Sequence, residues 1–177
     1  MDLYIRPTSA PTAIEQVLAA LLDDVGRQMS EREIREIVGL PKPTCSAALR
    51  TLAREGLVET RSYGRTLMFA VSASDPLIRH AKIARTLARV RDLTDDLSKI
   101  SDSVVLFGSA SVGEDSVDSD IDLFVVSRDP EGVRKAAARF PRVQAVVVTP
   151  QQHMRELAEG STLASEVARG IRLWERP

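Results

Sequence analysis

A run of acidic residues between two apolar segments is the feature that most restricts how this chain can fold. The stretch from Phe107 to Phe124 reads FGSASVGEDSVDSDIDLF, and it separates the apolar segments 104–107 and 121–127. Short apolar segments rich in β-branched residues are typical of buried strands. A loop with glycine, serine and many carboxylates between two buried strands can bind phosphate, calcium or a catalytic metal ion. The spacing of its residues distinguishes these possibilities.

The two glycines match the beginning of a Walker A phosphate loop, G-x-x-x-x-G, from Gly108 to Gly113. A Walker A loop needs Lys and then Ser or Thr directly afterwards to hold the terminal phosphates. Glu114 and Asp115 stand at those positions instead. Their negative charge would repel a triphosphate, so the sequence excludes a Walker A loop.

Three aspartates, Asp118, Asp120 and Asp122, have the first spacings of an EF-hand calcium loop. The sixth position of that loop must be glycine to turn sharply, whereas this chain has Leu123, followed by Phe124. A backbone that enters a buried strand cannot wrap around calcium. The sequence therefore excludes an EF-hand as well.

The remaining interpretation is a metal site at the beginning of a strand. Asp120 and Asp122 alternate with apolar residues, so their carboxylates project from the same face. Two adjacent carboxylates repel each other unless a cation joins them. Oxygen ligands suit magnesium or manganese, which keep positions open for phosphate oxygens.

The glycine-serine segment before these aspartates is suited to phosphate. Gly108 permits close approach of the backbone, and Ser109 begins a short helix whose amides can bind a phosphate group. Gly113 lets that helix turn back toward the aspartates. We therefore expect a nucleoside triphosphate to bind through metal and amides together.

The pattern G-S-x-x-x-G-x-x-x-x-x-S-D-x-D-L resembles the nucleotidyltransferase superfamily related to DNA polymerase beta, especially its minimal members. The resemblance covers about residues 99–149. It implies a nucleoside triphosphate as ligand or substrate, with Mg or Mn. The residues it implies are Gly108, Ser109, Gly113 and Ser119 for nucleotide binding, and Asp120 and Asp122 for metal ligation and catalysis.

One position departs from that superfamily, in which a later strand usually supplies a third carboxylate. The matching segment here, 142–149, has no acid, and Gln144 could occupy the site. A neutral amide binds a second cation more weakly and is no base. Glu156, Glu159 or His153 could substitute, although such residues are more often solvated or packing residues. The sequence predicts metal-dependent nucleotide binding and leaves catalysis open.

The first part of the chain has the order of a winged helix-turn-helix. Segment 13–26 has helical periodicity after the candidate cap Thr12, and Ser30 with Glu33 forms a capping box before a second helix. A third helix runs from near Thr44 to Gly56. Two strand-like segments, 57–61 and 66–71, flank a turn that contains glycine.

The stretch 43–79 resembles the winged helix-turn-helix of the ArsR and MarR classes of bacterial and archaeal regulators, and the pattern L-x-x-L-x-x-E-G-L-V before a glycine-containing wing carries that likeness. The resemblance covers about the first 75 residues. The resemblance implies a homodimer on double-stranded DNA with two-fold symmetry. Because short polar and basic residues on the second helix and the wing reach bases and phosphates, we expect contacts from Lys42, Thr44, Ser46, Arg50, Arg61, Tyr63 and Arg65. The alternative is a protein-interaction module, because several glutamates weaken the basic field.

Composition sets few further limits. The 24 Lys and Arg residues nearly balance the 25 Asp and Glu residues, so any nucleic-acid surface must be local. Cys45 is the sole cysteine, which excludes an internal disulfide and disfavours thiolate metal sensing. No apolar run approaches the ~20 residues of a membrane span, and no signal peptide is evident. We expect a soluble, cytoplasmic protein without membrane contact.

We therefore expect an α+β chain with three parts: a winged helix-turn-helix over 1–75, a linker or dimerisation helix over 76–100, and a nucleotidyltransferase-like domain over 101–177. In the last part, strands at 104–107, 121–127 and 143–149 and helices at 131–140 and 151–170 indicate a mixed sheet flanked by helices.

Two functions fit this organisation. The first is a DNA-binding transcriptional regulator whose nucleotidyltransferase-like domain senses Mg-nucleotide or engages a protein partner. The second is an active enzyme that moves a nucleoside monophosphate onto a hydroxyl of protein, RNA or a small molecule. A third, based on analogy alone, is the antitoxin of a prokaryotic toxin-antitoxin pair.

Overall fold

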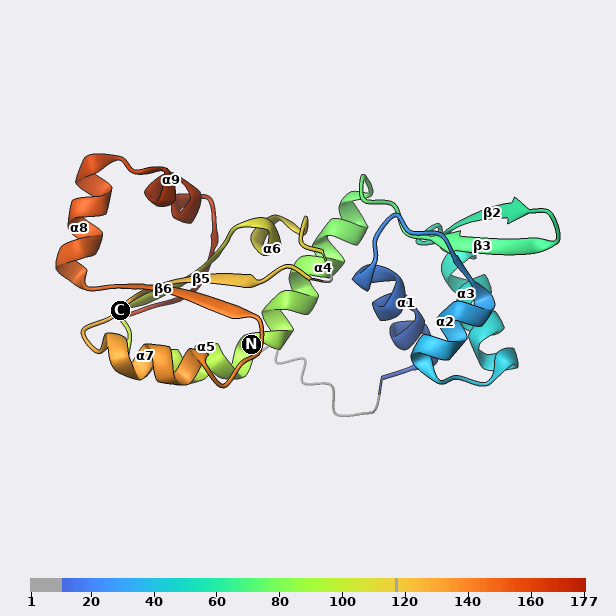
Figure 1. Cartoon of the computed structure of the whole chain (residues 1–177), viewed down its shortest axis with the longest axis horizontal. Coiled ribbons are helices and arrows are strands. Elements are labelled where there is room, and N and C mark those ends of the chain that lie inside the picture. Colours follow the sequence, from blue (N-terminus) through green and yellow to red (C-terminus); the bar gives the residue numbers. More distant parts are fainter. Residues whose placement is uncertain (1–10, 117) are drawn as a thin grey trace. The chain divides into compact units, whose positions relative to one another are not determined.

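The computed structural model describes residues 11–116 and 118–177, and its elements appear in Figure 1. The chain divides into two compact units, with the boundary between Ile78 and Arg79. Each unit has its own helices and its own sheet, which confirms the expected α+β class. Among the described residues, no helix has the length and apolarity to cross a membrane.

Three helices form most of the first unit: α1 (Ala13–Asp23), α2 (Glu31–Val38) and α3 (Lys42–Arg54). The first two begin with capping boxes, formed by Thr12 with Glu15 and by Ser30 with Glu33. Each box satisfies amides that the first turn of a helix leaves without partners. The helices pack through fully buried side chains, among them Leu21, Ile34, Cys45, Leu49 and Leu52.

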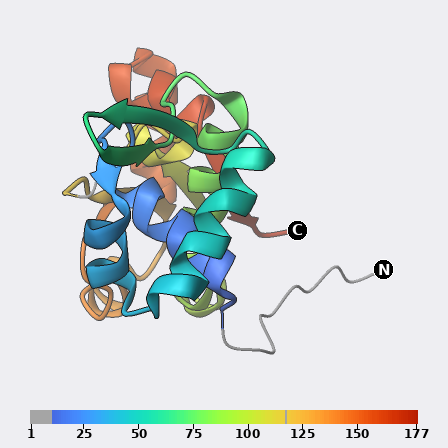
Figure 2. The same ribbon diagram turned by 90° about the vertical axis from the view of Figure 1, so that its right-hand side faces the viewer.

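A hairpin follows the helices, as the sequence predicts. Strands β2 (Glu59–Tyr63) and β3 (Thr66–Ala70) pair antiparallel, and Tyr63 lies opposite Thr66 across a tight turn. Figure 2 looks onto this unit and shows the hairpin beyond one end of the helices. The short strand β1 (Met29–Ser30) pairs with β3 as well. It was not predicted, because a strand of only two residues has no periodic pattern.

The helical segment expected over 76–100 is divided into α4 (Pro76–Arg89) and α5 (Arg91–Leu97). The break lies at Val90, whose φ of −93° and ψ of 3° depart from helical values. Leu93 and Leu97 are buried in the core of the second unit. The carboxyl-terminal part of the expected linker is therefore built into that core.

The second unit contains a mixed sheet with the order β6-β5-β4-β7. Strand β4 (Ser103–Phe107) is antiparallel to β5 (Ile121–Val126) and to β7 (Ile171–Glu175), and β5 is parallel to β6 (Val143–Val148). Strand β7 was not predicted from the sequence. The helical stretch expected over 151–170 is two helices, α8 (Pro150–Glu159) and α9 (Thr162–Ala168), separated at Gly160.

The two faces of this sheet are covered differently. Figure 1 shows α5 and α7 (Pro130–Ala137) along one face and α8 and α9 on the other. The first face is closely packed, and its buried residues are Leu93, Leu97, Val104, Leu106, Ala110, Leu123, Val125 and Val133. The second face buries only Val105, Phe107, Phe124 and Val126, and neither α8 nor α9 contributes a fully buried residue.

Candidate functional site

The acidic loop joins the end of β4 to the beginning of β5, with the short helix α6 (Ser109–Val112) in between. Gly108 has φ 70° and ψ −162°, a backbone conformation that is essentially restricted to glycine. Gly113 is left-handed, with φ 72°, and ends α6. Gly113 therefore ends the short helix, as expected from the sequence, and Gly108 sets the conformation at its start.

The loop begins directly against Asp122. A Cβ atom at Gly108 would lie 2.7 Å from Oδ2 of Asp122, so only glycine fits this close approach. Asp122 is half-buried opposite Phe107 of β4 and Gln144 of β6. Asp120 is exposed, two residues earlier. The structure thus brings the glycine, the following amides and the carboxylate pair to one end of two strands.

The carboxylate pair is electrostatically unfavourable in the chain alone. Burial raises the pKa of the Asp122 carboxyl, and the charges of Asp120 and Glu166 raise it further. A cation bound between the two carboxylates would relieve this repulsion. The residues therefore fit a divalent cation with oxygen ligands. Within the described ranges, no three His, Cys, Asp or Glu residues group closely enough to hold a metal ion, so further ligands would be water and phosphate.

Gln144, the residue expected where a third carboxylate would stand, lies opposite Asp122 on β6. Its Nε2 donates a hydrogen bond of 2.9 Å to Oδ2 of Asp120. The amide thus satisfies one oxygen of the pair without adding negative charge. It cannot accept a proton from an attacking hydroxyl.

Three residues were considered from the sequence as replacements for a third carboxylate, and each is engaged or exposed elsewhere. Glu156 accepts a hydrogen bond of 2.7 Å from the Ser161 hydroxyl. The His153 ring packs against Phe124 with 5.4 Å between ring centroids, and Glu159 is exposed at the end of α8. Besides Asp120, the carboxylate that raises the pKa of Asp122 is Glu166 of α9. Sequence reasoning missed Glu166, because only the packing of α9 over the sheet brings it near.

Hydrogen bonds stabilise the part of the loop just before Asp120. The Ser119 hydroxyl accepts a hydrogen bond of 2.8 Å from the Ser116 amide. The Ser119 carbonyl accepts one of 2.7 Å from Arg142, whose own φ is 68°. Ser119 thus shapes the loop around the aspartates.

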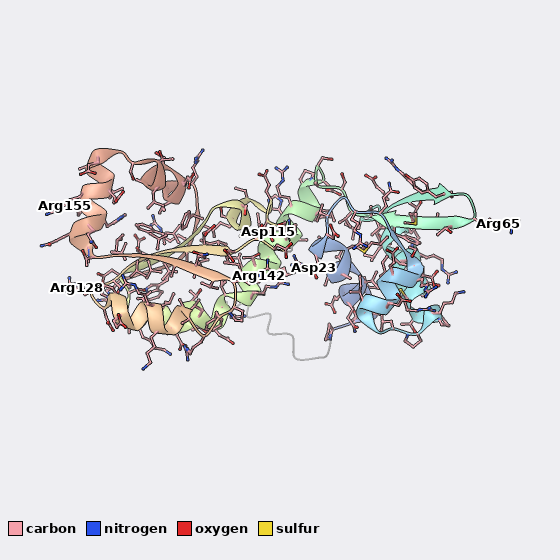
Figure 3. The ribbon with its side chains drawn as sticks, in the orientation of Figure 1. Asp23, Arg65, Asp115, Arg128, Arg142 and Arg155 are labelled. Carbon is pink, nitrogen blue, oxygen red and sulfur yellow. The ribbon has the colours of Figure 1, made fainter. Side chains whose placement is uncertain are left out.

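A buried lysine ties the same loop to α4. Lys82 is only 4% exposed, and its Nζ lies 3.3 Å from Oδ1 of Asp115 and donates to the carbonyl of the same residue. Figure 3 shows Asp115 beside α4. A side chain at Gly113 would collide with the backbone of Arg79, which is also in α4. Sequence reasoning missed this attachment, since Lys82 and Asp115 are far apart in the chain.

The expected nucleic-acid contacts lie on α3 and the hairpin. Lys42, Thr44 and Arg50 are exposed on α3, and Arg61, Tyr63 and Arg65 are exposed on the hairpin. Figure 3 places Arg65 at the tip of the hairpin, pointing away from the helices.

Two further observations modify this surface. The Ser46 hydroxyl donates a hydrogen bond of 2.6 Å to Glu31 of α2, so it is engaged within the protein. Arg32 and Arg35 of α2 line one groove together with Lys42 and Arg65. Arg32 pairs with Glu36 at 2.9 Å, and Glu31 lines the same groove. Arg35 is the cation that sequence reasoning overlooked here, because it considered only the second helix and the wing.

Two family models match this chain, one within each unit. Residues 87–160 match the family model described as a nucleotidyltransferase domain, and residues 15–74 match that of the sugar-specific transcriptional regulator TrmB. No curated protein matches the chain. A crystal structure of a candidate nucleotidyltransferase from Sulfolobus solfataricus is similar over 55% of this chain and 87% of that chain, with 19% identity and a TM-score of 0.39.

Proposed function

We propose that this chain, which joins a TrmB-like regulator domain to a nucleotidyltransferase domain, is a DNA-binding transcriptional regulator that senses a nucleoside triphosphate. The triphosphate binds to the second unit together with a divalent cation, Mg or Mn. The single observation that carries the proposal is the close approach of Gly108 to Asp122, which sets the phosphate-binding backbone beside the cation-binding carboxylates.

Each residue of the site has a defined part in binding. Asp120 and Asp122 hold the cation, whose charge offsets that of the phosphate oxygens. The backbone at Gly108 and Ser109 approaches the phosphates, because the glycine leaves no side chain in the way. Ser119 and Gly113 keep the loop in place around them.

Sensing is favoured over transfer by the amide of Gln144. Nucleotidyl transfer needs a group that takes the proton of the attacking hydroxyl, usually a carboxylate close to the metal. Gln144 instead donates to Asp120. The site therefore retains the groups that bind a nucleotide and lacks a base on β6.

A route from the nucleotide to the regulator domain is available through α4. Lys82 fastens the acidic loop to this helix, and the helix continues without a break to Pro76 in the first unit. A change in the loop on nucleotide binding therefore acts on the segment that leads to the DNA-binding unit.

Nucleotidyl transfer onto a hydroxyl of protein, RNA or a small molecule is the second candidate function. The observation that favours it is the carboxylate pair of Asp120 and Asp122, which lies where a bound cation would also stabilise the charge that develops on the phosphate during transfer.

The deciding experiment compares the native chain with the double variant Asp120→Asn plus Asp122→Asn and with the control Asp118→Asn, in which a nearby exposed carboxylate is removed. Isothermal titration with ATP and Mg should give binding for the native chain and the control, and none for the double variant or in EDTA. Binding that persists in EDTA would overturn the proposal. Transfer of α-labelled nucleotide by the native chain alone would favour the enzyme instead.

The DNA-binding unit is tested by its salt dependence. Proteins that neutralise phosphates lose affinity steeply as salt rises, and each lost contact lowers the logarithmic slope by about 1. Replacing Lys42, Arg35 or Arg65 with Ala should each lower the slope for the DNA upstream of the gene, measured by fluorescence anisotropy. A slope unchanged in all three variants would contradict the assigned surface. A DNA site with two symmetric halves, bound with a stoichiometry of two chains, is expected for the homodimer.

A further inference from the structure

A cavity of about 270 Å³ lies between the second face of the sheet and the helices α8 and α9. Its floor is formed by Val105 and Phe124, and its cover includes Leu157, Leu163 and Val167. All of these residues belong to the second unit. The cavity has an apolar centre, and its volume approaches that of small-ligand sites, which begin at about 300 Å³.

The floor of the cavity lies one step along β5 from Asp122. Side chains two positions apart on a strand share a face, so Asp122 and Phe124 project from the same side of β5. The register agrees, because Phe107 lies opposite Asp122 and Val105 lies opposite Phe124. Two strand residues span about 6.6 Å. The floor of the cavity is therefore one such step from the carboxylate that would hold the cation.

The cover over the cavity is loosely packed. Neither α8 nor α9 buries a residue completely, and Leu157 is 52% exposed. On the opposite face, Leu93, Leu97 and Val133 are all 0% exposed beneath α5 and α7. The space under α8 and α9 is thus left where the helices do not close onto the sheet, and a ligand could enter without unfolding the core.

The charges around the cavity select against an anion. Glu156 lines it, and the two ions of the Arg172–Glu175 pair offset each other. His153 is the remaining titratable group of the lining. Phosphate groups belong at Gly108 and Ser109, so the ligand part in the cavity must be largely apolar and uncharged.

We infer that the cavity receives the base of the bound nucleotide. The inference rests on the proposed function, since the phosphates must lie at Gly108 and the cation at Asp122. A planar uncharged heterocycle fits the apolar space between Phe124 and α9. The ribose spans the step from the carboxylates to this floor. The cavity therefore gives a nucleoside triphosphate a higher affinity than a triphosphate without a base.

The test compares Mg-ATP with Mg-tripolyphosphate, which has the phosphates but no base. In the native chain, ATP should bind at least tenfold more tightly than tripolyphosphate by isothermal titration. Ala164→Phe fills the cavity from α9, because Ala164 is part of its lining. This variant should lose most of the tenfold preference for ATP, and its affinity for tripolyphosphate should stay within twofold of that of the native chain. Ser165→Phe places the same side chain at the next, exposed position of α9 and should behave as the native chain.

The outcomes separate the two proposals. If neither ligand binds the native chain, the proposed function fails. If both bind equally well, or if Ala164→Phe leaves the preference for ATP intact, the inference about the cavity is overturned. A measurement on the native chain covers the case in which Ala164→Phe does not fold: nuclear Overhauser contacts should join the adenine protons of ATP to the methyl groups of Leu163 and Val167. Contacts to other methyl groups only would overturn the inference.

Discussion

Asp122 lies in surroundings that oppose its own ionisation. Its pKa is raised by burial, by Asp120 and by Glu166. In the pH range between its ordinary pKa and the raised one, the folded chain binds more protons at this site than the unfolded chain. Folding stability therefore falls as the pH rises through that range, and at neutral pH the ionised carboxylate lowers it.

Replacing Asp122 with Asn should consequently have opposite effects on stability and on binding. Without metal at neutral pH, Asp122→Asn should unfold at a higher temperature than the native chain, and the difference should disappear below the ordinary pKa of aspartate, about 3.9. The same variant should lose its Mg-dependent affinity for ATP. Differential scanning calorimetry between pH 3 and 8 measures the first effect, with Asp118→Asn as the control. A lower melting temperature for Asp122→Asn at neutral pH would contradict the prediction.

Gly108 gives a second prediction at this scale. Gly108→Ala combines a backbone conformation reserved for glycine with a collision between Cβ and the Asp122 carboxylate. It should reduce the free energy of unfolding by about 1–3 kcal/mol and abolish ATP binding. Gly160→Ala is the matched control, since Gly160 has φ 63° and open space around the added atom. It should cost about 1 kcal/mol and leave ATP binding intact. Equal ATP affinities in the two variants would refute the assigned role of Gly108.

At the scale of elements, the attachment of α4 to the acidic loop depends on one buried charge. Removing a single partner of a buried ion pair commonly costs about 3–5 kcal/mol, because the other charge stays buried without compensation. Lys82→Met should therefore lower the free energy of unfolding by about 3 kcal/mol, measured by urea denaturation. Lys99→Met is the control, because the Lys99 side chain is 70% exposed and its 3.1 Å pair with Asp96 lies in solvent. Its expected cost is below about 1 kcal/mol, and similar costs for both variants would contradict the role of Lys82.

The elements also show how far sequence reasoning reaches. The cap at Thr12, the capping box at Ser30 and apolar periodicity are local signals, and they predicted the helices of the first unit. Gly108 and the aspartates were likewise noticed in the sequence as candidates, because their spacing lies within one segment. Strand β7 was missed, since it exists only by pairing with β4. The contacts of Lys82 with Asp115 and of Ser46 with Glu31 join distant positions, so no local pattern could reveal them.

At the scale of the whole molecule, the two units share the continuous helix α4. If nucleotide binding acts through this helix, saturating Mg-ATP should change the affinity for DNA by a factor between about 5 and 150. Linkage then requires DNA to change the affinity for Mg-ATP by the same factor. Anisotropy titrations with and without nucleotide measure both. The double variant Asp120→Asn plus Asp122→Asn should bind DNA as the nucleotide-free native chain does, at every ATP concentration. An unchanged DNA affinity of the native chain at saturating Mg-ATP would show that the units act independently.

The hydrogen bond from Gln144 to Asp120 also has an evolutionary consequence. Codons for glutamine and glutamate differ in one base, and the two side chains have nearly the same shape. Gln144→Glu would replace the donor to Asp120 with a third negative charge, which strengthens cation binding and supplies a proton acceptor on β6. If the domain binds a nucleotide as proposed, a lineage that carries it can therefore pass between reading a nucleotide and consuming it by a single point mutation, without rebuilding the loop or the sheet.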